Sequence, residues 1–285
     1  MAYSKELESL VRAHWVSMGN HLLDLDSDKA MWEMLDERRA DEALDLLASR
    51  IPFPLAGCRL LEIGSGVGAT QAAARQRGIK SVGLEPGPGV YAARQLLSEH
   101  GFRPTDVVCG AAEGLPFRDS LFDVVCSFQV LEHTRNPELA LDEAIRVLKP
   151  GGYFVHVFPN YGSFWEGHYG IPWLPHLPRT LGRLYVRLLG YDPSMLASLQ
   201  LLSHGRVASF FGRRPRTRID SWGLELWERR VRTLEFSEWA HLARLKGMVR
   251  WLHRLRLVNL AVAVGRACHF ETPIVLVGTK LPPAV

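Results

Sequence analysis

Residues 60–85 read LLEIGSGVGATQAAARQRGIKSVGLE, and the rest of the chain is best understood outward from this stretch. Residues 59–63 are an apolar run of the kind found in buried strands, and the turn GSGVG at 64–68 ends it at once. Residues 69–77 then have a helical composition, and residues 81–85 form a second strand-like run that ends in a carboxylate. This order predicts the first βαβ unit of a nucleotide-binding α/β domain.

The glycines of this turn are compatible with more than one ligand. Glycine permits a tight turn and lets ligand atoms approach the backbone, and the carboxylate of Glu85 could accept hydrogen bonds from both hydroxyls of a ribose. Gly64, Gly66 and Ala69 satisfy the dinucleotide fingerprint G-x-G-x-x-A, while residues 62–68 also satisfy E-x-G-x-G-x-G. The turn alone therefore fits a nicotinamide or flavin dinucleotide as well as S-adenosylmethionine, and a turn without ligand is the alternative.

Strands and helices alternate through the following residues. Helices are predicted at 90–100 and 136–148, and further strands at 105–109, 121–128, 153–158, 216–222 and 273–280. The run at 121–128, LFDVVCSF, is almost continuously apolar, which is typical of a strand buried on both faces. Strict alternation with short connections predicts an α/β fold with a doubly wound, mostly parallel seven-stranded sheet.

Five sequence blocks, in this order and spacing, carry a resemblance to a known family. They are LEIGSGVG at 61–68, GLEP at 83–86, AEGLPF at 112–117, FDVVCSFQVLEH at 122–133 and RVLKPGGYF at 146–154. Over about residues 58–159 the chain resembles the class I S-adenosylmethionine-dependent methyltransferases, above all the branch of the ubiquinone and menaquinone biosynthesis methyltransferases (methyltransferase type 11). The resemblance implies a Rossmann-like fold with an antiparallel last strand and S-adenosyl-L-methionine as the cofactor, because dinucleotide folds do not normally carry the later blocks.

The resemblance also implies which residues bind this cofactor. The glycine loop and its strand hold it, Glu85 holds the ribose hydroxyls, and the residues after the third strand line the adenine pocket. The implied cofactor-binding residues are Glu62, Gly64, Ser65, Gly66, Gly68, Glu85, Pro86, Ala112, Glu113 and Gln129. Many relatives have an acidic residue where this chain has Ala111, so we expect Glu113 or backbone groups to contact the adenine amino group instead.

The domain organisation predicted from the sequence is a single methyltransferase domain over residues 1–285. A helical flank at 1–57, with helices at 3–18 and 27–49, precedes the cofactor-binding core at 58–159. The part at 160–285 supplies the acceptor-binding segment, a helical C-terminal insertion and the final strands. The flanking helices are interpreted as a lid over the nucleotide site or as ordinary packing.

Residues 160–195 are loop-rich and aromatic, and they follow the fifth strand, at the edge where open α/β sheets bind ligands. We expect this segment to enclose the methyl acceptor, with Glu166 and His168 available for proton transfer. His133, beyond the fourth strand, is a second candidate base, because neutral imidazole accepts protons near pH 7; support of the cofactor loop is its alternative role. Glu166 and His168 alone are two ligands, so no metal site is predicted.

The function predicted from these features is S-adenosylmethionine-dependent methyl transfer to a small-molecule or amphiphilic acceptor, with oxygen as the favoured nucleophile. The sulfonium is already a strong methyl donor, so the protein must align a nucleophile, exclude water and remove a proton. A non-catalytic S-adenosylmethionine-binding regulator is one alternative, and a dinucleotide-dependent oxidoreductase is another. Residues 158–161, FPNY, differ from the N-P-P-Y signature of adenine-modifying methyltransferases and follow the wrong strand, so a nucleic-acid target is disfavoured.

Composition indicates a protein of the reducing cytoplasm. Hydrophobic residues make up 47% of the chain, and no apolar run approaches the about 20 residues of a membrane span. The first 16 residues are interrupted by charges, unlike a signal peptide. The cysteines are scattered and none has C-x-x-C spacing, which argues against disulfides or a zinc site; they are Cys58, Cys109, Cys126 and Cys268.

Net charge is +4, and the arginines concentrate after residue 206. Between residues 236 and 269 apolar residues recur at three- and four-residue steps with arginines between them, which predicts a basic amphipathic helix. Such a helix could rest on an anionic membrane and admit a lipid-linked acceptor at the inner membrane face. Packing of its apolar face on the sheet is the alternative. The pattern specifies no oligomeric state.

Overall fold

The computed structural model describes residues 3–18, 32–235 and 243–283. Two helices precede the sheet, α1 (Lys5–Ser17) and α3 (Glu37–Arg50). The first half of the sheet alternates strands with helices; its elements are β1 (Arg59–Ile63), α4 (Ala69–Gln76), β2 (Lys80–Glu85), α5 (Gly89–Glu99), η2 (Pro104–Asp106), β3 (Val107–Cys109), β4 (Phe122–Phe128), η3 (Leu131–His133), α6 (Pro137–Val147) and β5 (Leu148–Phe158).

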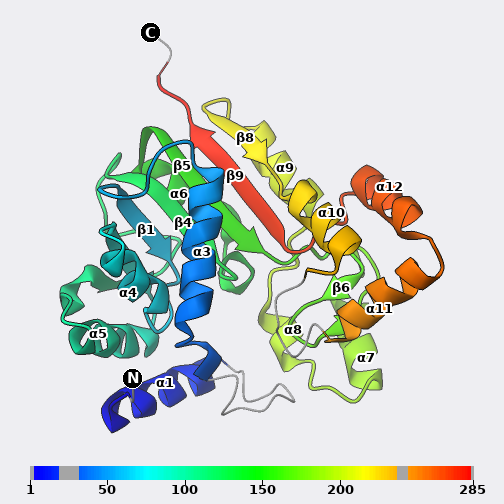
Figure 1. The fold of residues 1–285 in the computed structure, drawn as a ribbon, viewed down its shortest axis with the longest axis horizontal. Helices are drawn as coiled ribbons and strands as arrows, with labels where there is room; N and C mark the ends of the chain where they lie inside the picture. Colours follow the sequence, from blue (N-terminus) through cyan, green and yellow to red (C-terminus); the bar gives the residue numbers. More distant parts are fainter. Residues whose placement is uncertain (1–2, 19–31, 236–242, 284–285) are drawn as a thin grey trace.

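After β5 the chain leaves the sheet and returns to it twice (Figure 1). The elements of this second half are β6 (Trp165–Glu166), β7 (Ile171–Pro172), α7 (Arg179–Leu188), α8 (Ser194–Ser198), α9 (His204–Gly212), β8 (Thr217–Ser221), α10 (Leu224–Thr233), α11 (Ala243–Arg254), α12 (Val258–Cys268) and β9 (Ile274–Lys280). Helices α7, α11 and α12 lie to one side of the sheet, on the right in Figure 1.

The main sheet has seven strands in the described residues, in the order β3-β2-β1-β4-β5-β9-β8. Strands β1 to β5 pair in parallel, and β9 pairs antiparallel with both of its neighbours, β5 and β8. The predicted mostly parallel seven-stranded sheet with an antiparallel last strand is therefore confirmed. The order reverses direction at β1, which places a switch point between β1 and β4, where open α/β sheets bind their ligands.

Helices cover both faces of the sheet because side chains of each strand alternate between them. On one face, Leu61, Val125 and Phe154 pack against α6 and α9. On the other face, Leu60 and Val155 pack against α3, α4 and α10. Two apolar clusters, one on each side, are what a doubly wound sheet requires.

The predicted N-terminal helices are found with one change in their bounds. Helix α1 is capped by Ser4, whose side chain accepts a hydrogen bond from the Leu7 N–H, and its apolar side packs on α5. The predicted second helix covers 27–49, of which 27–31 lie outside the described residues. Helix α3 begins only at Glu37, because the Asp36 side chain accepts from the Arg38 N–H at 3.0 Å and caps it there.

In its described part, residues 243–269, the basic region predicted as one amphipathic helix forms the two helices α11 and α12. Arg256, between them, has a left-handed backbone with a φ of 57°, which an α-helix cannot continue through. Residues 236–242, including the predicted apolar positions Trp239 and Leu242, lie outside the described residues. In the described parts of the chain, no helix has both the length and the apolar character needed to cross a membrane.

Candidate cofactor and acceptor site

The glycine turn after β1 is held in a conformation that only glycine adopts without strain. Gly64, Gly66 and Gly68 have φ values of 72°, 52° and 84°. A Cβ atom on Gly64 would lie 2.3 Å from a methyl carbon of Val130, so there is no room for one. The N–H of Gly64 donates to the carbonyl of Leu84 at 2.7 Å, which ties the turn to the end of β2.

Glu85, at the carboxyl end of β2, faces this turn. Its Oε2 accepts a hydrogen bond from the Gly66 N–H at 2.9 Å, and the residue is buried. Burial raises the pKa of Glu85 to about 7, and the hydrogen bond from Gly66 acts in the opposite direction. The structure therefore joins Glu85, the acid predicted to hold the ribose, to the glycine turn through one hydrogen bond.

His14 of α1 lies against the same site, although the sequence did not indicate it. The residue is 3% exposed, and neither ring nitrogen has a hydrogen-bond partner in the part of the chain that the structure describes. The ring lies close to two glycines of the site. A Cβ atom added to Gly66 would be 3.9 Å from its Nε2, and one added to Gly89 would be 2.8 Å from its Nδ1. Burial lowers the pKa of His14 to about 4, so the imidazole is neutral at pH 7. Unsatisfied buried nitrogens are costly, and a polar ligand beside the turn would satisfy them.

Two other predicted cofactor residues next to the turn make internal contacts. Glu62 is buried, and its carboxylate accepts from Nε2 of Gln71 at 2.7 Å, which braces β1 against α4. Burial raises the pKa of Glu62 to about 7, while the bond from Gln71 lowers it. The hydroxyl of Ser65 is buried without a partner and lies over Gly83, where an added Cβ would approach it to 2.6 Å. Pro86 is exposed at the end of β2.

The other predicted cofactor residues, which follow β3 and β4, lie in three different surroundings. Ala112 is buried in the core beneath the loop after β3. Glu113 does not replace the missing acid at Ala111 in an obvious way, because its Oε1 already accepts from the backbone N–H groups of Arg135 and Asn136, at 2.6 and 3.1 Å. Gln129 has a left-handed backbone, with a φ of 56°, and it turns the chain at the end of β4.

On the acceptor side, three residues of the segment after β5 form a buried polar group. Glu166 is 1% exposed, and its Oε1 accepts from the Tyr161 hydroxyl at 3.0 Å and pairs with Nδ1 of His168 at 2.8 Å. Burial alone would raise the pKa of Glu166, but His168 and the backbone donors hold it below its usual range. Burial also opposes the charged imidazole, yet Glu166 outweighs it and raises the pKa of His168.

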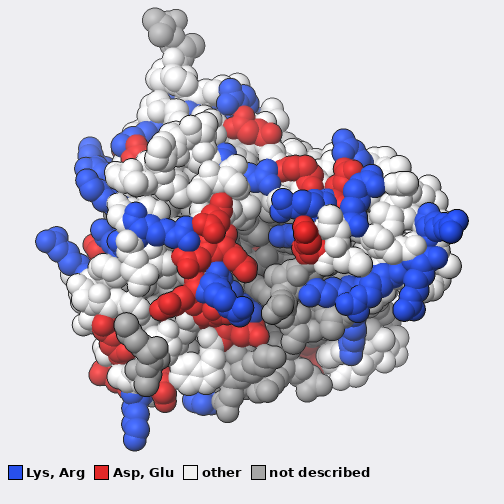
Figure 2. All heavy atoms as spheres, in the orientation of Figure 1, with Lys and Arg blue, Asp and Glu red and all other residues white. Residues whose placement is uncertain are grey.

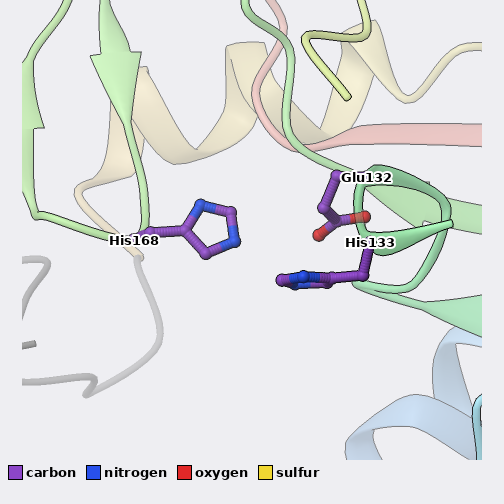
Figure 3. Close-up of side chains that lie close together, drawn as sticks. All are labelled: Glu132, His133 and His168. Atoms are coloured by element: carbon purple, nitrogen blue, oxygen red, sulfur yellow. The ribbon is translucent and has the colours of Figure 1, made fainter. Parts of the chain in front are cut away.

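His133 and Glu132 face His168 from the turn η3, which follows β4 (Figure 3). The rings of His133 and His168 lie 5.4 Å apart between centroids, at an interplanar angle of 80°. Glu132 is fully buried, and among the other described residues neither oxygen of its carboxylate has a hydrogen-bond partner. Burial raises the pKa of Glu132 to about 7, and the charge of His168 opposes this. The structure thus brings together the candidate bases His133 and His168, and it adds Glu132, which the sequence placed only at the rim.

The aromatic residues of 160–195 differ from the expectation that they enclose an acceptor. Most of them pack on one another in a small separate core, because the segment folds into a hairpin and two helices and not into open loops. Its buried members are Tyr161, Tyr169, Ile171, Trp173, Val186, Met195, Leu196 and Leu199. Asn160 fastens this unit to the chain before β9, since its Nδ2 donates to the carbonyls of His269 and Glu271 at 2.8 Å each.

Comparison with known proteins agrees with this geometry. A protein-family model described as a methyltransferase domain matches residues 61–156, which run from β1 into β5; the match includes the glycine turn and Glu85 but not Glu166 or His168. The chain carries a class I S-adenosylmethionine-dependent methyltransferase domain. S-adenosyl-L-methionine is the cofactor of such a domain, and the tight glycine turn, the strand-end acid Glu85 and the ring nitrogens of His14, unpaired among the described residues, suit a ribose-bearing polar ligand.

Curated relatives of this methyltransferase match it over its core. The ubiquinone biosynthesis O-methyltransferase of Nitrobacter winogradskyi is 33% identical over 127 residues, which cover 42% of this chain and 48% of the relative. An uncharacterised methyltransferase of Mycolicibacterium vanbaalenii is 35% identical over 154 residues, covering 52% of this chain and 58% of the relative. The chain therefore spans about half the length of the curated relatives it matches.

Two solved structures share the fold of the methyltransferase over nearly its whole length. The [4+2]-cyclase SpnF has a TM-score of 0.53 at 19% identity, covering 99% of this chain and 98% of that one. A chain of the complex between the Haloferax volcanii Trm112 methyltransferase activator and a methyltransferase has a TM-score of 0.50 at 20% identity, covering 99% and 100%. These likenesses concern the fold, which does not by itself fix the reaction.

The sheet also bears on the dinucleotide alternative. A dinucleotide-binding sheet of the order 3-2-1-4-5-6 is parallel throughout, whereas here the antiparallel strand β9 is inserted between β5 and β8. Together with the family match, this disfavours an oxidoreductase and favours the S-adenosylmethionine interpretation of the glycine turn.

Proposed function

We propose that this methyltransferase transfers the methyl group of S-adenosylmethionine to an oxygen nucleophile on a small-molecule or amphiphilic acceptor. The observation that carries the proposal is the contact of the buried Glu166 with the half-buried His168, 2.8 Å apart, on the side of the sheet where β4 and β5 end. A carboxylate on Nδ1 fixes the imidazole tautomer and leaves Nε2 free to accept a proton.

Each group of the site has a defined part in this reaction. The acceptor oxygen forms a bond to the methyl carbon, the carbon–sulfur bond breaks, and its electron pair remains on sulfur in S-adenosylhomocysteine. The hydroxyl proton passes to Nε2 of His168, and Glu166 stabilises the resulting imidazolium. A hydroxyl needs this proton removal as it attacks, which is why a buried base favours oxygen over a neutral amine or a thioether.

Transfer of a labelled methyl group from S-adenosylmethionine to a panel of phenols, carboxylates and amines tests the proposal. We expect hydroxylated acceptors to be methylated, and His168→Ala to lower turnover by roughly 10²–10⁴-fold with unchanged cofactor affinity. His100→Ala, at the end of α5 away from the acceptor side, is the matched control. Transfer to amines alone would overturn the choice of oxygen. Cofactor binding without transfer to any acceptor would support the regulator alternative.

An amphiphilic acceptor is favoured by the exposed surface of α7, α11 and α12. Leucines on this surface are strongly exposed, Leu184 by 52%, Leu188 by 76% and Leu260 by 60%, and Trp251 is exposed by 57%. Arg244 at the start of α11 donates to the Tyr191 hydroxyl just beyond α7, so these helices belong to one surface. Lys and Arg side chains gather over α11 and α12 in Figure 2. Apolar and cationic side chains together match an anionic lipid surface.

The side of α11 that would meet lipid differs from the predicted one. Val249 is buried against α10 and α12, and Leu245 packs beside it, so the predicted apolar face partly covers protein. Leu255 of the predicted face remains exposed at 45%, and so does Trp251, outside that face, at 57%. The peripheral membrane contact is therefore proposed through these residues and α7, at a membrane that would deliver the acceptor.

A further inference from the structure

The group Glu132, His133 and His168 has the composition and spacing of a metal site. One ligand atom from each residue lies within 4.8 Å of the other two. Ligand atoms around a tetrahedral ion, each about 2.1 Å from it, lie roughly 3.4 Å apart, so small side-chain rotations would close the set. Glu132 and His133 come from the turn η3 on one side and His168 comes from the other side, and the three side chains lie close together (Figure 3).

The buried carboxylate of Glu132 is the second observation that points to a ligand. It is 0% exposed, and neither of its oxygens has a hydrogen-bond partner in another residue of 3–18, 32–235 or 243–283. A buried carboxylate is normally paired with a cation or with several donors, because leaving it unpaired is costly. A cation between Glu132 and the two imidazoles would give this carboxylate the partner that the described residues do not provide.

The orientation of the two imidazole rings also suits a shared ion. The lone pair of an imidazole nitrogen lies in the plane of its ring, so one ion can be bound by two rings only where their planes intersect. The planes of His133 and His168 are almost perpendicular, at 80°, and therefore intersect. By contrast, His204 and His269 near Glu271 also form a close group, but their rings are stacked at 18° and 3.7 Å between centroids. Near-parallel planes cannot direct both lone pairs to one point.

His168 has the outer partner that metal-bound histidines usually have. Its Nδ1 is paired with Glu166 at 2.8 Å, and Glu166 is fixed in turn by the Tyr161 hydroxyl and by the backbone N–H of Tyr169, at 3.0 and 2.7 Å. A carboxylate on one ring nitrogen sets the tautomer and turns the other nitrogen toward the ion. Glu166 has both oxygens engaged, so it acts as this support and not as a ligand.

We propose that Glu132, His133 and His168 bind one divalent transition-metal ion, best matched by Zn²⁺, with a coordination position left open toward the acceptor. Two histidines and one glutamate with an open fourth position form a ligand set of catalytic zinc sites. From the sequence, Glu166 and His168 were considered as metal ligands. In the structure, His168 is joined by Glu132 and His133 of the turn η3, and Glu166 supports His168 from outside the group.

The catalytic consequence of this site rests on the proposed function. An acceptor hydroxyl bound at the open position would lose its proton to water, because a bound Zn²⁺ lowers the pKa of an oxygen ligand. The resulting alkoxide or phenolate then attacks the methyl carbon, and the carbon–sulfur bond breaks with its electrons on sulfur. With the ion present, Nε2 of His168 is a ligand, and the ion replaces it as the group that activates the oxygen.

The test is Zn²⁺ binding to the tag-free protein after treatment with a chelator, followed by calorimetry and, with Co²⁺, by visible absorption. We expect about one equivalent of Zn²⁺ to bind, and Glu132→Gln, His133→Ala and His168→Ala each to lower its affinity by about 100-fold or more. Glu166→Gln should lower it by roughly 10–100-fold. His269→Ala in the stacked group is the matched control and should leave binding unchanged.

Cofactor affinity, measured on every variant, separates loss of the metal site from loss of folding. His133 is exposed, so its replacement is the variant least expected to disturb the fold. No Zn²⁺ bound by the wild-type protein, or equal binding by His133→Ala and His269→Ala, would overturn the inference. Methyl transfer that proceeds at full rate in chelator, with no Zn²⁺ bound, would do so while leaving the proposed function intact. Zn²⁺ bound through these three residues without methyl transfer to any acceptor would sustain the metal site and remove the proposed function.

Discussion

The carboxylate of Glu85 accepts a hydrogen bond from the backbone N–H of Gly66 at 2.9 Å. Glu85 is the last residue of β2, and Gly66 lies in the turn that follows the neighbouring parallel strand β1. The hydrogen bond holds the glycine turn close to the carboxylate. One carboxylate oxygen is thereby engaged within the protein. If Glu85 binds the ribose as the resemblance implies, we expect the ribose to share this carboxylate with the glycine turn, so that cofactor binding and order in the turn would be coupled.

Replacement of Glu85 by alanine should weaken cofactor binding by roughly 2–4 kcal/mol, because a charged acceptor of two ribose hydrogen bonds is lost. Calorimetry with S-adenosylmethionine and with its demethylated product at pH 8, where a carboxyl of pKa about 7 is ionised, measures this directly. Glu99→Ala, on the exposed end of α5, is the control. Unchanged affinity in Glu85→Ala would refute the assignment of this residue to the ribose.

Gly64 and Gly87 form a matched pair that separates backbone strain from steric clash. Both have a φ near 70°, at 72° and 71°, but an added Cβ meets Val130 at 2.3 Å in Gly64 and meets nothing within 4 Å in Gly87. Either alanine variant should lose about 1–2 kcal/mol for the left-handed backbone. Gly64→Ala should lose a further 1–3 kcal/mol or so for overpacking, together with most cofactor binding.

Urea unfolding of the two variants, with cofactor titrations, provides the measurement. Equal loss of stability in both variants would mean that Val130 can move aside and that the turn is less confined than its geometry indicates.

Glu62 should make the protein less stable as the pH rises. Burial raises its pKa in the folded protein to about 7, above the ordinary value of 4.5, so the folded state binds more protons than the unfolded chain between these values. Its contribution to the free energy of unfolding is therefore highest below pH 4.5 and declines up to about pH 7. Relative to wild type, Glu62→Gln should gain roughly 1–3 kcal/mol between pH 5 and pH 8. Urea unfolding at both pH values tests this, and a pH-independent difference would contradict it.

The exposed leucines of α7 give the membrane proposal a defined variant. Wild-type protein should sediment with anionic vesicles, less so with neutral vesicles, and less at physiological than at low salt. Leu184→Glu with Leu188→Glu should lower the bound fraction several-fold, because it places charge in the headgroup boundary. Tyr91→Glu changes an equally exposed residue of α5 and should have no effect. Absence of any preference for anionic vesicles in wild type would argue for an acceptor in solution.

The sequence predicted the sheet well because its signals are local. The runs at β1, β2, β4 and the second half of β5 are rich in apolar residues, β1 is followed by Gly64, and β2 ends at Glu85 before Pro86. The observed helix boundaries differ from the predicted ones where a single residue ends or begins a helix. Asp36 caps α3 at its start, and the left-handed backbone of Arg256 separates α11 from α12. Helix α10 was not predicted. The two-residue strands β6 and β7 were not predicted either, since so short a hairpin has no periodicity to detect.

The parts of the site that were not predicted depend on contacts between distant residues. His14 reaches the turn at Gly66 only because α1 packs on α5, and a single histidine in an amphipathic helix carries no motif. Glu132 stood in a quoted block, but its unpaired carboxylate becomes informative only beside His168, which a hairpin places there. The aromatic residues of 160–195 suggested a pocket by their density, whereas the helices of that segment gave them a core of their own.

The insertion of β9 between β5 and β8 has a consequence for the nascent chain. Until β9 is synthesised, the long apolar strand β5 has one unpaired edge, and β8 has no partner among the strands of the main sheet. Roughly 115 residues separate the end of β5 from the start of β9, which at about 5–20 residues per second corresponds to some 6–23 seconds of translation. During this interval the edge can pair with other chains. Because β9 is the last strand to be synthesised, we expect the exposed edge of β5 to need protection by a chaperone during synthesis. Without such protection, we expect the nascent chain to aggregate through this edge.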